Sequence, residues 1–369
     1  MADTGFVQIR NLVKRFGDHA AVNDVSFDVP EGHTLALLGP SGCGKTTILR
    51  CLAGLETPDG GTIEIAARTV FDHARHVDLV PEKRELGIVF QSYAVWPHMT
   101  VAENVAFPLK VRGMARAERL QRASRMLETV GLAGFEDRPA TLVSGGQQQR
   151  IALARALVHE PRLVLFDEAL SNLDAQLREQ MRLELRLLQE RLRFTAIYVT
   201  HDQAEAFGLA DTVVLMNHGS VETIGSARDV FHRPSSAFAA RFFGLNVLEG
   251  RVSKAASDGR HVDVALNDRL SIRGRVTEGM DLSEGTPVLA CIRKEYVAIE
   301  RSDTQDGATG IIAAASFLGV AEEFVVDIQG VMLRITQPAT GLARGDRVRV
   351  ALSSDDWIVL PMSNEGGEP

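Results

Sequence analysis

Short apolar runs alternate with helical patterns from Phe6 to about Arg241. The continuous apolar runs predict buried strands over Thr34–Leu38, Leu163–Phe166, Thr195–Val199 and Val213–Met216. Strands that alternate with helices are typical of a parallel sheet with helices on both faces. The pattern therefore predicts an α/β domain in this part of the chain.

A long helix is predicted between two of these strands, because one apolar stripe recurs at steps of three and four residues. The stripe consists of Leu177, Met181, Leu185, Leu188 and Leu192. Residues from about 92 to 160 are also mostly helical in pattern, for example over Ala117–Val130. We expect them to form a helical subdomain inserted into the α/β domain.

The pattern changes after about Gly244, where short alternating segments follow one another with Gly and Asp turns between them. The segments are Val247–Val252, His261–Leu266, Leu270–Val276, Val288–Ile299, Glu323–Ile328, Val331–Thr336 and Arg347–Leu352. Short strands at this spacing predict a small β-barrel or a pair of barrels. We therefore expect two domains, over residues 1–244 and 245–369.

Composition narrows the class of protein. Apolar residues make up 45% and charged residues 24% of the 369 residues, which excludes a disordered chain. The net charge of −8 argues against nucleic acid as the main partner, since such partners attract a basic face. Met1–Gly5 show no start of a secretory signal, and no run of about eighteen apolar residues predicts a membrane span. The scattered cysteines are typical of a cytosolic protein with reduced thiols.

A glycine-rich loop follows the first predicted strand and opens a helix that stops at Gly54. The loop consists of Gly39, Pro40, Ser41, Gly42, Cys43, Gly44, Lys45, Thr46 and Thr47. Its glycines let backbone N–H groups surround anionic oxygens, and the helix N-terminus adds partial positive charge. Lys45 supplies a charge for the β- and γ-phosphates, and the Thr46 hydroxyl can bind Mg²⁺. The loop therefore predicts a nucleotide site.

Two carboxylates, Asp167 and Glu168, end the predicted strand that begins at Leu163. Open α/β sheets bind their ligands at the carboxyl ends of the strands. Asp167 can hold Mg²⁺ and Glu168 can polarise an attacking water. A solvated strand end is the other interpretation of this segment alone, but the phosphate loop favours the functional one.

Ser144, Gly145, Gly146 and Gln147 lead into a helix that extends to about His159. Ser144 and Gln147 have capping-box spacing, so a purely structural helix start is one interpretation. Two glycines in a first turn are unfavourable unless something approaches the backbone closely, and a phosphate would do so.

Two further polar residues follow predicted strands. His201 comes directly after Thr195–Thr200, and Gln91 ends the apolar segment Gly87–Phe90. The Gln91 amide could reach Mg²⁺ or water. Each residue alone is also compatible with an ordinary polar strand end.

Taken in order, these motifs resemble the ATP-binding-cassette (ABC) ATPase family over about the first 240 residues. The matches are Walker A at Gly39–Thr47, the Q-loop at Gln91, the signature at Ser144–Gln147, Walker B at Leu163–Asp167, the catalytic glutamate at Glu168, the D-loop at Ser171–Asp174 and the switch histidine at His201. The fold class that the resemblance implies is α/β, a P-loop NTPase cassette with a helical subdomain, followed by an all-β OB-like regulatory domain.

The resemblance implies an ATPase that uses ATP and Mg²⁺ and works as a head-to-tail homodimer enclosing two ATP molecules. Phe16 matches the aromatic residue that stacks on adenine. Ser144, Gly145 and Gly146 of one subunit would contact the γ-phosphate held by Lys45 of the other.

Further roles follow from the same resemblance. Asp174 would lie in the dimer contact, and His201 would sense the γ-phosphate. Glu168 would act as the general base, while Asp167, Thr46 and Gln91 would hold the metal.

The remainder of the chain resembles the importer branch with a β-barrel (TOBE) regulatory domain, found in maltose, polyamine and ferric-iron transporters. Gln91–Val105 is most similar to the ferric-iron and polyamine groups. This implies a motor subunit on the cytoplasmic face of the inner membrane. Its partners would be two transmembrane permease subunits and, indirectly, a solute-binding protein outside the membrane.

Two other functions fit the cassette motifs. One is a soluble cassette protein of DNA repair or translation, although such proteins usually carry twin cassettes or a long coiled-coil insertion. The other is a non-hydrolysing regulator in which ATP only locks the dimer, although the presence of Glu168 and His201 argues against it.

Overall fold

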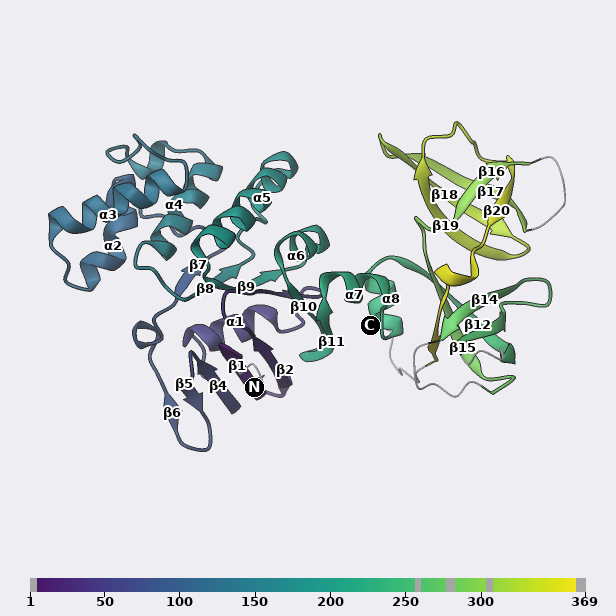
Figure 1. Cartoon of the computed structure of the whole chain (residues 1–369), viewed down its shortest axis with the longest axis horizontal. Helices are drawn as coiled ribbons and strands as arrows, with labels where there is room; N and C mark the ends of the chain where they lie inside the picture. Colours follow the sequence, from purple (N-terminus) through teal and green to yellow (C-terminus); the bar gives the residue numbers. More distant parts are fainter. Residues whose placement is uncertain (1–4, 256–259, 277–282, 303–307, 363–369) are drawn as a thin grey trace. The chain divides into compact units, whose positions relative to one another are not determined.

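The computed structural model describes residues 5–255, 260–276, 283–302 and 308–362. The chain divides into two compact units, Met1–Val230 and Phe231–Pro369 (Figure 1). The predicted division at residues 244 and 245 follows the change in sequence pattern and stays a prediction. The absence of a secretory signal was inferred largely from residues 1–4, which lie outside the described residues.

A six-stranded sheet forms the centre of the first unit, in the order β11-β10-β3-β9-β8-β7. The strands are β3 (Thr34–Leu38), β7 (Gly87–Val89), β8 (Leu163–Asp167), β9 (Thr195–Thr200), β10 (Thr212–Asn217) and β11 (Ser220–Ser226). All neighbours from β10 to β7 pair in parallel, and β11 pairs antiparallel with β10. The parallel sheet predicted from the apolar runs is therefore present.

The first part of the chain forms a separate antiparallel sheet, β2-β1-β4-β5-β6, which the sequence pattern did not predict. Its strands are β1 (Val7–Phe16), β2 (His19–Val29), β4 (Gly60–Ile65), β5 (Arg68–Asp72) and β6 (Val77–Asp78). Only Gly17 and Asp18 connect β1 to β2. A connection of two residues can join antiparallel strands, whereas parallel strands need a crossover of a dozen residues or more.

Helices separate and cover these sheets. They are α1 (Lys45–Ala53), α2 (Val101–Val111), α3 (Arg116–Thr129), α4 (Gly145–Leu157), α5 (Ala175–Leu192) and α6 (Gln203–Leu209), with 3₁₀ turns at Pro81–Lys83 and Ala140–Leu142. The helix α7 (Ala227–His232) lies at the boundary of the two units, and α8 (Ala237–Phe242) and a 3₁₀ turn at Ser354–Asp356 belong to the second unit. The helices α2, α3 and α4 lie between β7 and β8 in the chain, within the segment where the sequence predicts helices. On α5 the predicted stripe is buried at Met181, Leu185 and Leu188, but Leu192, the last residue of the helix, is 40% exposed.

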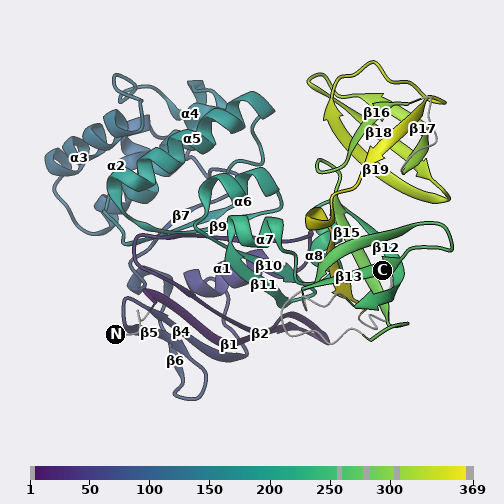
Figure 2. The ribbon, with the colours of Figure 1, turned by 45° about the vertical axis from the view of Figure 1, so that its right-hand side comes forward.

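Two apolar cores meet at the central sheet. Leu163 and Leu165 of β8 face a core that includes α1 and the antiparallel sheet, whereas Val164 and Phe166 face the core under α2–α5. Alternate residues of a strand point to opposite faces, so one short strand serves both cores. Figures 1 and 2 show α1 between the central sheet and the antiparallel sheet.

The second unit contains a closed barrel, β12-β13-β14-β21-β15, and a five-stranded sheet, β16-β20-β17-β18-β19, which share one apolar core. The strands are β12 (Leu245–Ala255), β13 (His261–Ala265), β14 (Ser271–Val276), β15 (Pro287–Arg293), β16 (Ala298–Arg301), β17 (Thr309–Phe317), β18 (Ala321–Ile328), β19 (Val331–Pro338), β20 (Arg347–Ala351) and β21 (Ile358–Pro361).

Three details of this unit differ from the prediction. The run Val288–Ile299 is not one strand, because a turn at Lys294–Tyr296 divides it into β15 of the barrel and β16 of the sheet. The strands β17 and β21 were not predicted.

Among the described residues, no helix is both long and apolar enough to cross a membrane.

Candidate functional site

The candidate site lies at the carboxyl ends of four neighbouring parallel strands. The phosphate loop follows β3, His201 follows β9, Asp167 ends β8 and Gln91 follows β7. The order β3-β9-β8-β7 therefore gathers residues that are far apart in the sequence along one edge of the sheet.

The phosphate loop connects the fully buried β3 to the N-terminus of α1. Gly44 adopts a left-handed conformation (φ 101°), and a Cβ there would lie 2.2 Å from the carbonyl oxygen of Ala21. At Gly39 a Cβ would lie 2.4 Å from the carbonyl oxygen of Met216. Both positions need glycine because of backbone from neighbouring strands, so the loop shape is built into the fold.

Lys45 folds back over this loop. Its ammonium group donates hydrogen bonds to the carbonyl oxygens of Gly39 (2.8 Å) and Pro40 (2.7 Å), and lies 3.6 Å from Sγ of Cys43. The side chain is only 5% exposed. A cation is thus held inside the loop, where an anionic oxygen can compete for its protons.

Thr46, which follows Lys45, contacts Asp167 at the end of β8. The Thr46 hydroxyl donates to Oδ1 of Asp167 at 3.2 Å. Burial raises the pKa of Asp167 above its usual value, while the hydrogen bond from Thr46 and the charge of Arg50 oppose the rise. A hydroxyl and a carboxylate side by side are hard oxygen donors of the kind that Mg²⁺ prefers.

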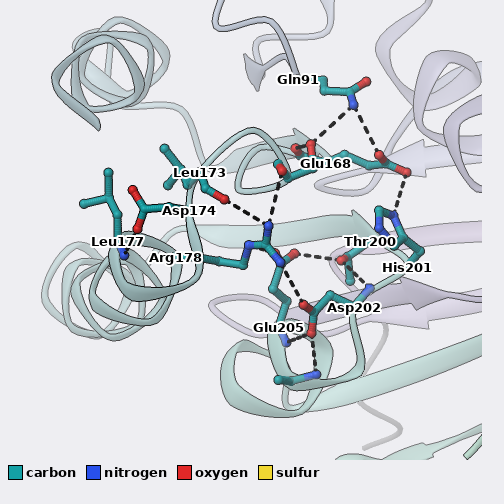
Figure 3. A network of polar contacts seen from close by, with 12 residues as sticks. Gln91, Glu168, Leu173, Asp174, Leu177, Arg178, Thr200, His201, Asp202 and Glu205 are labelled. Atoms are coloured by element: carbon teal, nitrogen blue, oxygen red, sulfur yellow. Dashed lines mark hydrogen bonds and ion pairs between the residues drawn. The ribbon is translucent and has the colours of Figure 1, made fainter. Parts of the chain in front are cut away.

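Glu168 lies at the centre of a small polar network (Figure 3). Its carboxylate lies 3.4 Å from Nε2 of Gln91 and 3.4 Å from Nδ1 of His201. The backbone of Glu168 is left-handed (φ 44°), and its N–H donates to the carbonyl oxygen of Val199 at 3.0 Å. This carboxylate is 24% exposed, so water can reach it.

The segment that follows Glu168 is tied into the same network. Ser171 Oγ donates to the Glu168 carbonyl oxygen (2.8 Å) and lies 3.3 Å from Nε2 of Gln91. Asn172 Nδ2 donates to the carbonyl oxygen of Gln91 at 2.8 Å. The sequence motif contained Ser171 and Asn172, but only Asp174 received a role from it, since no spacing rule shows which loop residue turns back toward Gln91.

The serine-glycine segment forms the N-terminus of α4. Ser144 and Gln147 make both bonds of a capping box, so the structural interpretation of their spacing holds within one chain. A Cβ at Gly146 would lie 2.9 Å from Cδ2 of Leu177, whereas a Cβ at Gly145 would meet nothing within 4 Å. Gly146 therefore packs closely against α5, whereas no described residue packs against Gly145.

The remaining predicted residues lie around these groups without joining them. Phe16 ends β1 with its ring half exposed and the ammonium group of Lys14 5.2 Å from the ring centre. Asp174 caps α5 by accepting a hydrogen bond from the Leu177 N–H at 2.9 Å. Among the described residues, no hydrogen bond or ion pair joins Ser144–Gln147 or Asp174 to the phosphate loop.

Comparisons with known proteins identify the family of the chain. The family described as ABC transporter matches residues 22–171, and the TOBE domain family matches residues 290–360. The Fe(3+) ions import ATP-binding protein FbpC of Photorhabdus laumondii subsp. laumondii is 38% identical over 99% of this chain and 100% of its own length. This chain belongs to the ABC transporter family.

Other ABC relatives support the same conclusion. The FbpC protein of Escherichia coli O157:H7 is 49% identical over 93% of both chains, and the spermidine/putrescine import ATP-binding protein PotA of Chromobacterium violaceum is 42% identical over 95% of this chain and 97% of its own. The solved dimeric cassette MJ0796 bound to ADP and Pi is 31% identical, with a TM-score of 0.53 over 60% of this chain and 99% of its own.

The family resemblance and the fold class expected from the motifs are thus confirmed, with a P-loop cassette followed by a TOBE β domain. The chain is an ABC ATPase of the importer type, as expected.

Proposed function

We propose that Glu168 is the general base of this ATPase, and that His201 and Gln91 orient it and the γ-phosphate. The observation that supports this most directly is the contact of one partly exposed carboxylate with both Nδ1 of His201 and Nε2 of Gln91. A base must lie within hydrogen-bond reach of the water it polarises, and an in-line attack needs that water to be held still. Lys45 would bind the β- and γ-phosphates in place of its two carbonyl partners.

We propose that Thr46 and Asp167 hold Mg²⁺, with Gln91 as a further ligand. The 3.2 Å contact between hydroxyl and carboxylate supports the first two residues. The Gln91 amide presents its nitrogen to Glu168, so it would have to turn its oxygen toward the ion. The bound ion would neutralise charge that develops on the phosphate oxygens.

We propose a head-to-tail homodimer in which Ser144–Gln147 of one chain complete the nucleotide site of the other. The open space around Gly145 supports close approach of a phosphate to the N-terminus of α4. Phe16 would stack on the adenine ring, since its exposed face needs only an aromatic plane. Asp174 would lie at the contact between the chains.

We propose that permease subunits dock on the helices that follow Gln91. A cavity of about 260 Å³ lies beside α2 and α3, and Phe107, Lys110, Arg116, Arg119 and Leu120 contribute to its lining. Trp96 packs against Phe107 with ring centres 4.3 Å apart, which connects the Q-loop segment to this cavity. A short helix from a permease would fit such a groove as an amphipathic ligand.

The solute we propose is ferric iron or a polyamine, because the similar proteins named above are importers of these two kinds. The chain would work at the cytoplasmic face of the inner membrane, attached through its permease partners, with a solute-binding protein as an indirect partner. Uptake of labelled iron and labelled spermidine by cells with and without this chain would distinguish the two. If cells without the chain take up both compounds normally, the proposed solute class is wrong.

Glu168→Gln tests the proposed base. We expect ATP binding to remain and kcat to fall by about three orders of magnitude or more, since the amide cannot accept the proton from water. The measurements are steady-state phosphate release and nucleotide affinity on the same preparation. Turnover close to that of the unmodified chain would show that another group acts as the base.

A further inference from the structure

Arg178 lies between two loops of the catalytic site (Figure 3). It stands in the first turn of α5, and its Nη2 donates to the carbonyl oxygens of Ser171 (3.3 Å) and Leu173 (3.0 Å). These carbonyls belong to the loop that follows Glu168. One edge of the guanidinium group is therefore bound to the backbone of that loop.

The other two nitrogens lie near the segment around His201. Nη1 of Arg178 lies 3.4 Å from Oδ2 of Asp202, whereas Nε, which is buried and makes no hydrogen bond among the described residues, lies 3.9 Å from Oε1 of Glu205. Glu205 is 6% exposed, and its second oxygen accepts a hydrogen bond of 2.7 Å from the Thr200 hydroxyl. The same hydroxyl accepts from the Asp202 N–H at 3.0 Å, so residues on both sides of His201 are fixed.

We propose that Arg178 is a positioning residue for ATP hydrolysis, which sets the spacing between His201 and Glu168 by holding both loops at once. Ser171 connects Arg178 to Glu168, because its hydroxyl donates to the Glu168 carbonyl oxygen at 2.8 Å. Asp202 connects Arg178 to His201, because it is adjacent to His201 in the chain. The inference depends on the proposed roles of Glu168 and His201.

The contacts need the shape of an arginine. A guanidinium group carries donors on separate nitrogens in one plane, so Nη2 can bind backbone carbonyls while Nη1 lies against a carboxylate. A lysine ammonium is a point donor and could keep one set of partners but not both. Glu205 also needs a cation, since burial raises its pKa and an unpaired buried carboxylate is costly.

A purely structural link between α5 and α6 is the competing explanation, and Arg186 provides a matched control for it. Arg186 lies two turns further along α5 and donates to the Leu209 carbonyl oxygen (3.0 Å) and the Asp211 carboxylate (3.0 Å). It therefore joins the same helix to the end of α6, and none of its contacts in the described part of the chain is with a residue of the proposed site.

The experiment compares Arg178→Met, Arg178→Lys and Arg186→Met in the full chain. Steady-state kcat and KM, affinity for a fluorescent ATP analogue and the thermal unfolding midpoint are measured for each. We expect Arg178→Met to lower kcat about 100-fold with analogue affinity changed less than about threefold, since small misplacements of reacting groups have effects of this size. Arg178→Lys should recover about tenfold of that loss, and Arg186→Met should keep kcat within about twofold.

Other results would overturn the inference. A kcat of Arg178→Met close to wild type, an equal fall in Arg186→Met, or a loss in analogue affinity that accounts for the lower turnover would each do so. If Arg178→Met does not fold, Arg178→Lys decides, and an unchanged kcat there refutes the inference. Turnover retained by Glu168→Gln refutes the proposed base instead, which keeps the two failures distinguishable.

Discussion

Glu168 occupies a backbone conformation that few non-glycine residues adopt (φ 44°). Such a conformation costs of order 1–3 kcal/mol and persists when surrounding bonds hold it. Here the Glu168 N–H is bound to Val199, and its carbonyl oxygen is bound to the Ser171 hydroxyl. In this conformation the side chain contacts Gln91 and His201, which supports a functional reason for the strain.

His159 provides a test of pH dependence at a single residue. Burial, with the charge of Arg112, lowers its pKa to about 4, and its Nδ1 is buried without a hydrogen-bond partner. The folded chain therefore takes up this proton at lower pH than the unfolded chain, so stability is full above the ordinary pKa and is lost as pH falls toward 4. The free energy of unfolding of the unmodified chain should fall between about pH 7 and about pH 5. We expect His159→Gln to reduce this fall by about 2 kcal/mol.

Urea unfolding of both chains at the two pH values measures the difference. Equal losses of unfolding free energy in the two chains would show that other groups titrate in this window.

The site residues that we propose from the sequence are those whose spacing has a direct chemical meaning, such as Lys45 in its glycine loop and Glu168 at a strand end. Arg178 could not be found in this way. Its partners are two backbone carbonyls and the carboxylates of Asp202 and Glu205, and only the turn after Glu168 brings them together. A residue that acts through backbone contacts carries no pattern of its own.

At the scale of elements, α4 shows how one sequence feature can have two causes. Gly146 is close to Leu177 of α5, but Gly145 faces open space. Packing within the chain therefore involves Gly146 but not Gly145. A ligand or a partner at the helix N-terminus would give a reason for Gly145.

Gly145→Ala separates these causes. The new methyl group meets nothing within 4 Å, and alanine is preferred over glycine in a helix by about 1 kcal/mol, so the unfolding midpoint should stay or rise. ATP turnover should fall by about tenfold or more if a phosphate approaches this backbone. Gly146→Ala serves as the comparison, because its methyl group would lie 2.9 Å from Cδ2 of Leu177, which must move to admit it, so its unfolding midpoint should rise less than that of Gly145→Ala. Full turnover in Gly145→Ala would mean that nothing approaches the helix tip.

Strand directions were predicted less well than helices. Continuous apolar runs identified β3, β8, β9 and β10 because buried parallel strands have little polar sequence. The antiparallel sheet was not predicted, because side chains of β1 and β2 alternate between the core and solvent. The antiparallel pairing of these strands depends on a turn of two residues. In the second unit, β15 and β16 were merged because the turn between them carries no glycine or proline signal.

At the scale of the whole molecule, the proposed homodimer makes each catalytic site a product of two chains. A chain with a defective phosphate loop and a chain with a defective helix tip should then complement each other. Their mixed dimer pairs the intact loop of one chain with the intact tip of the other in one of its two sites.

Mixing Lys45→Ala with Gly145→Trp tests this expectation. Each variant alone should be inactive, and an equal mixture should recover up to about a quarter of wild-type turnover, since half of the dimers are mixed and each has one intact site. Phosphate release measured before and after mixing gives the result. A mixture as inactive as its components would argue that one chain supplies the entire site.

The strand β8 separates two cores, with Leu163 and Leu165 on one side and Val164 and Phe166 on the other. Its last residue, Asp167, directly follows Phe166 at the edge of the sheet where we propose the nucleotide site. A change of side-chain volume in either core can therefore displace the same carboxylate, because packed interiors transmit strain. In a genetic selection, an activity defect caused by a substitution against one face of this strand should be corrected by second-site substitutions against the opposite face.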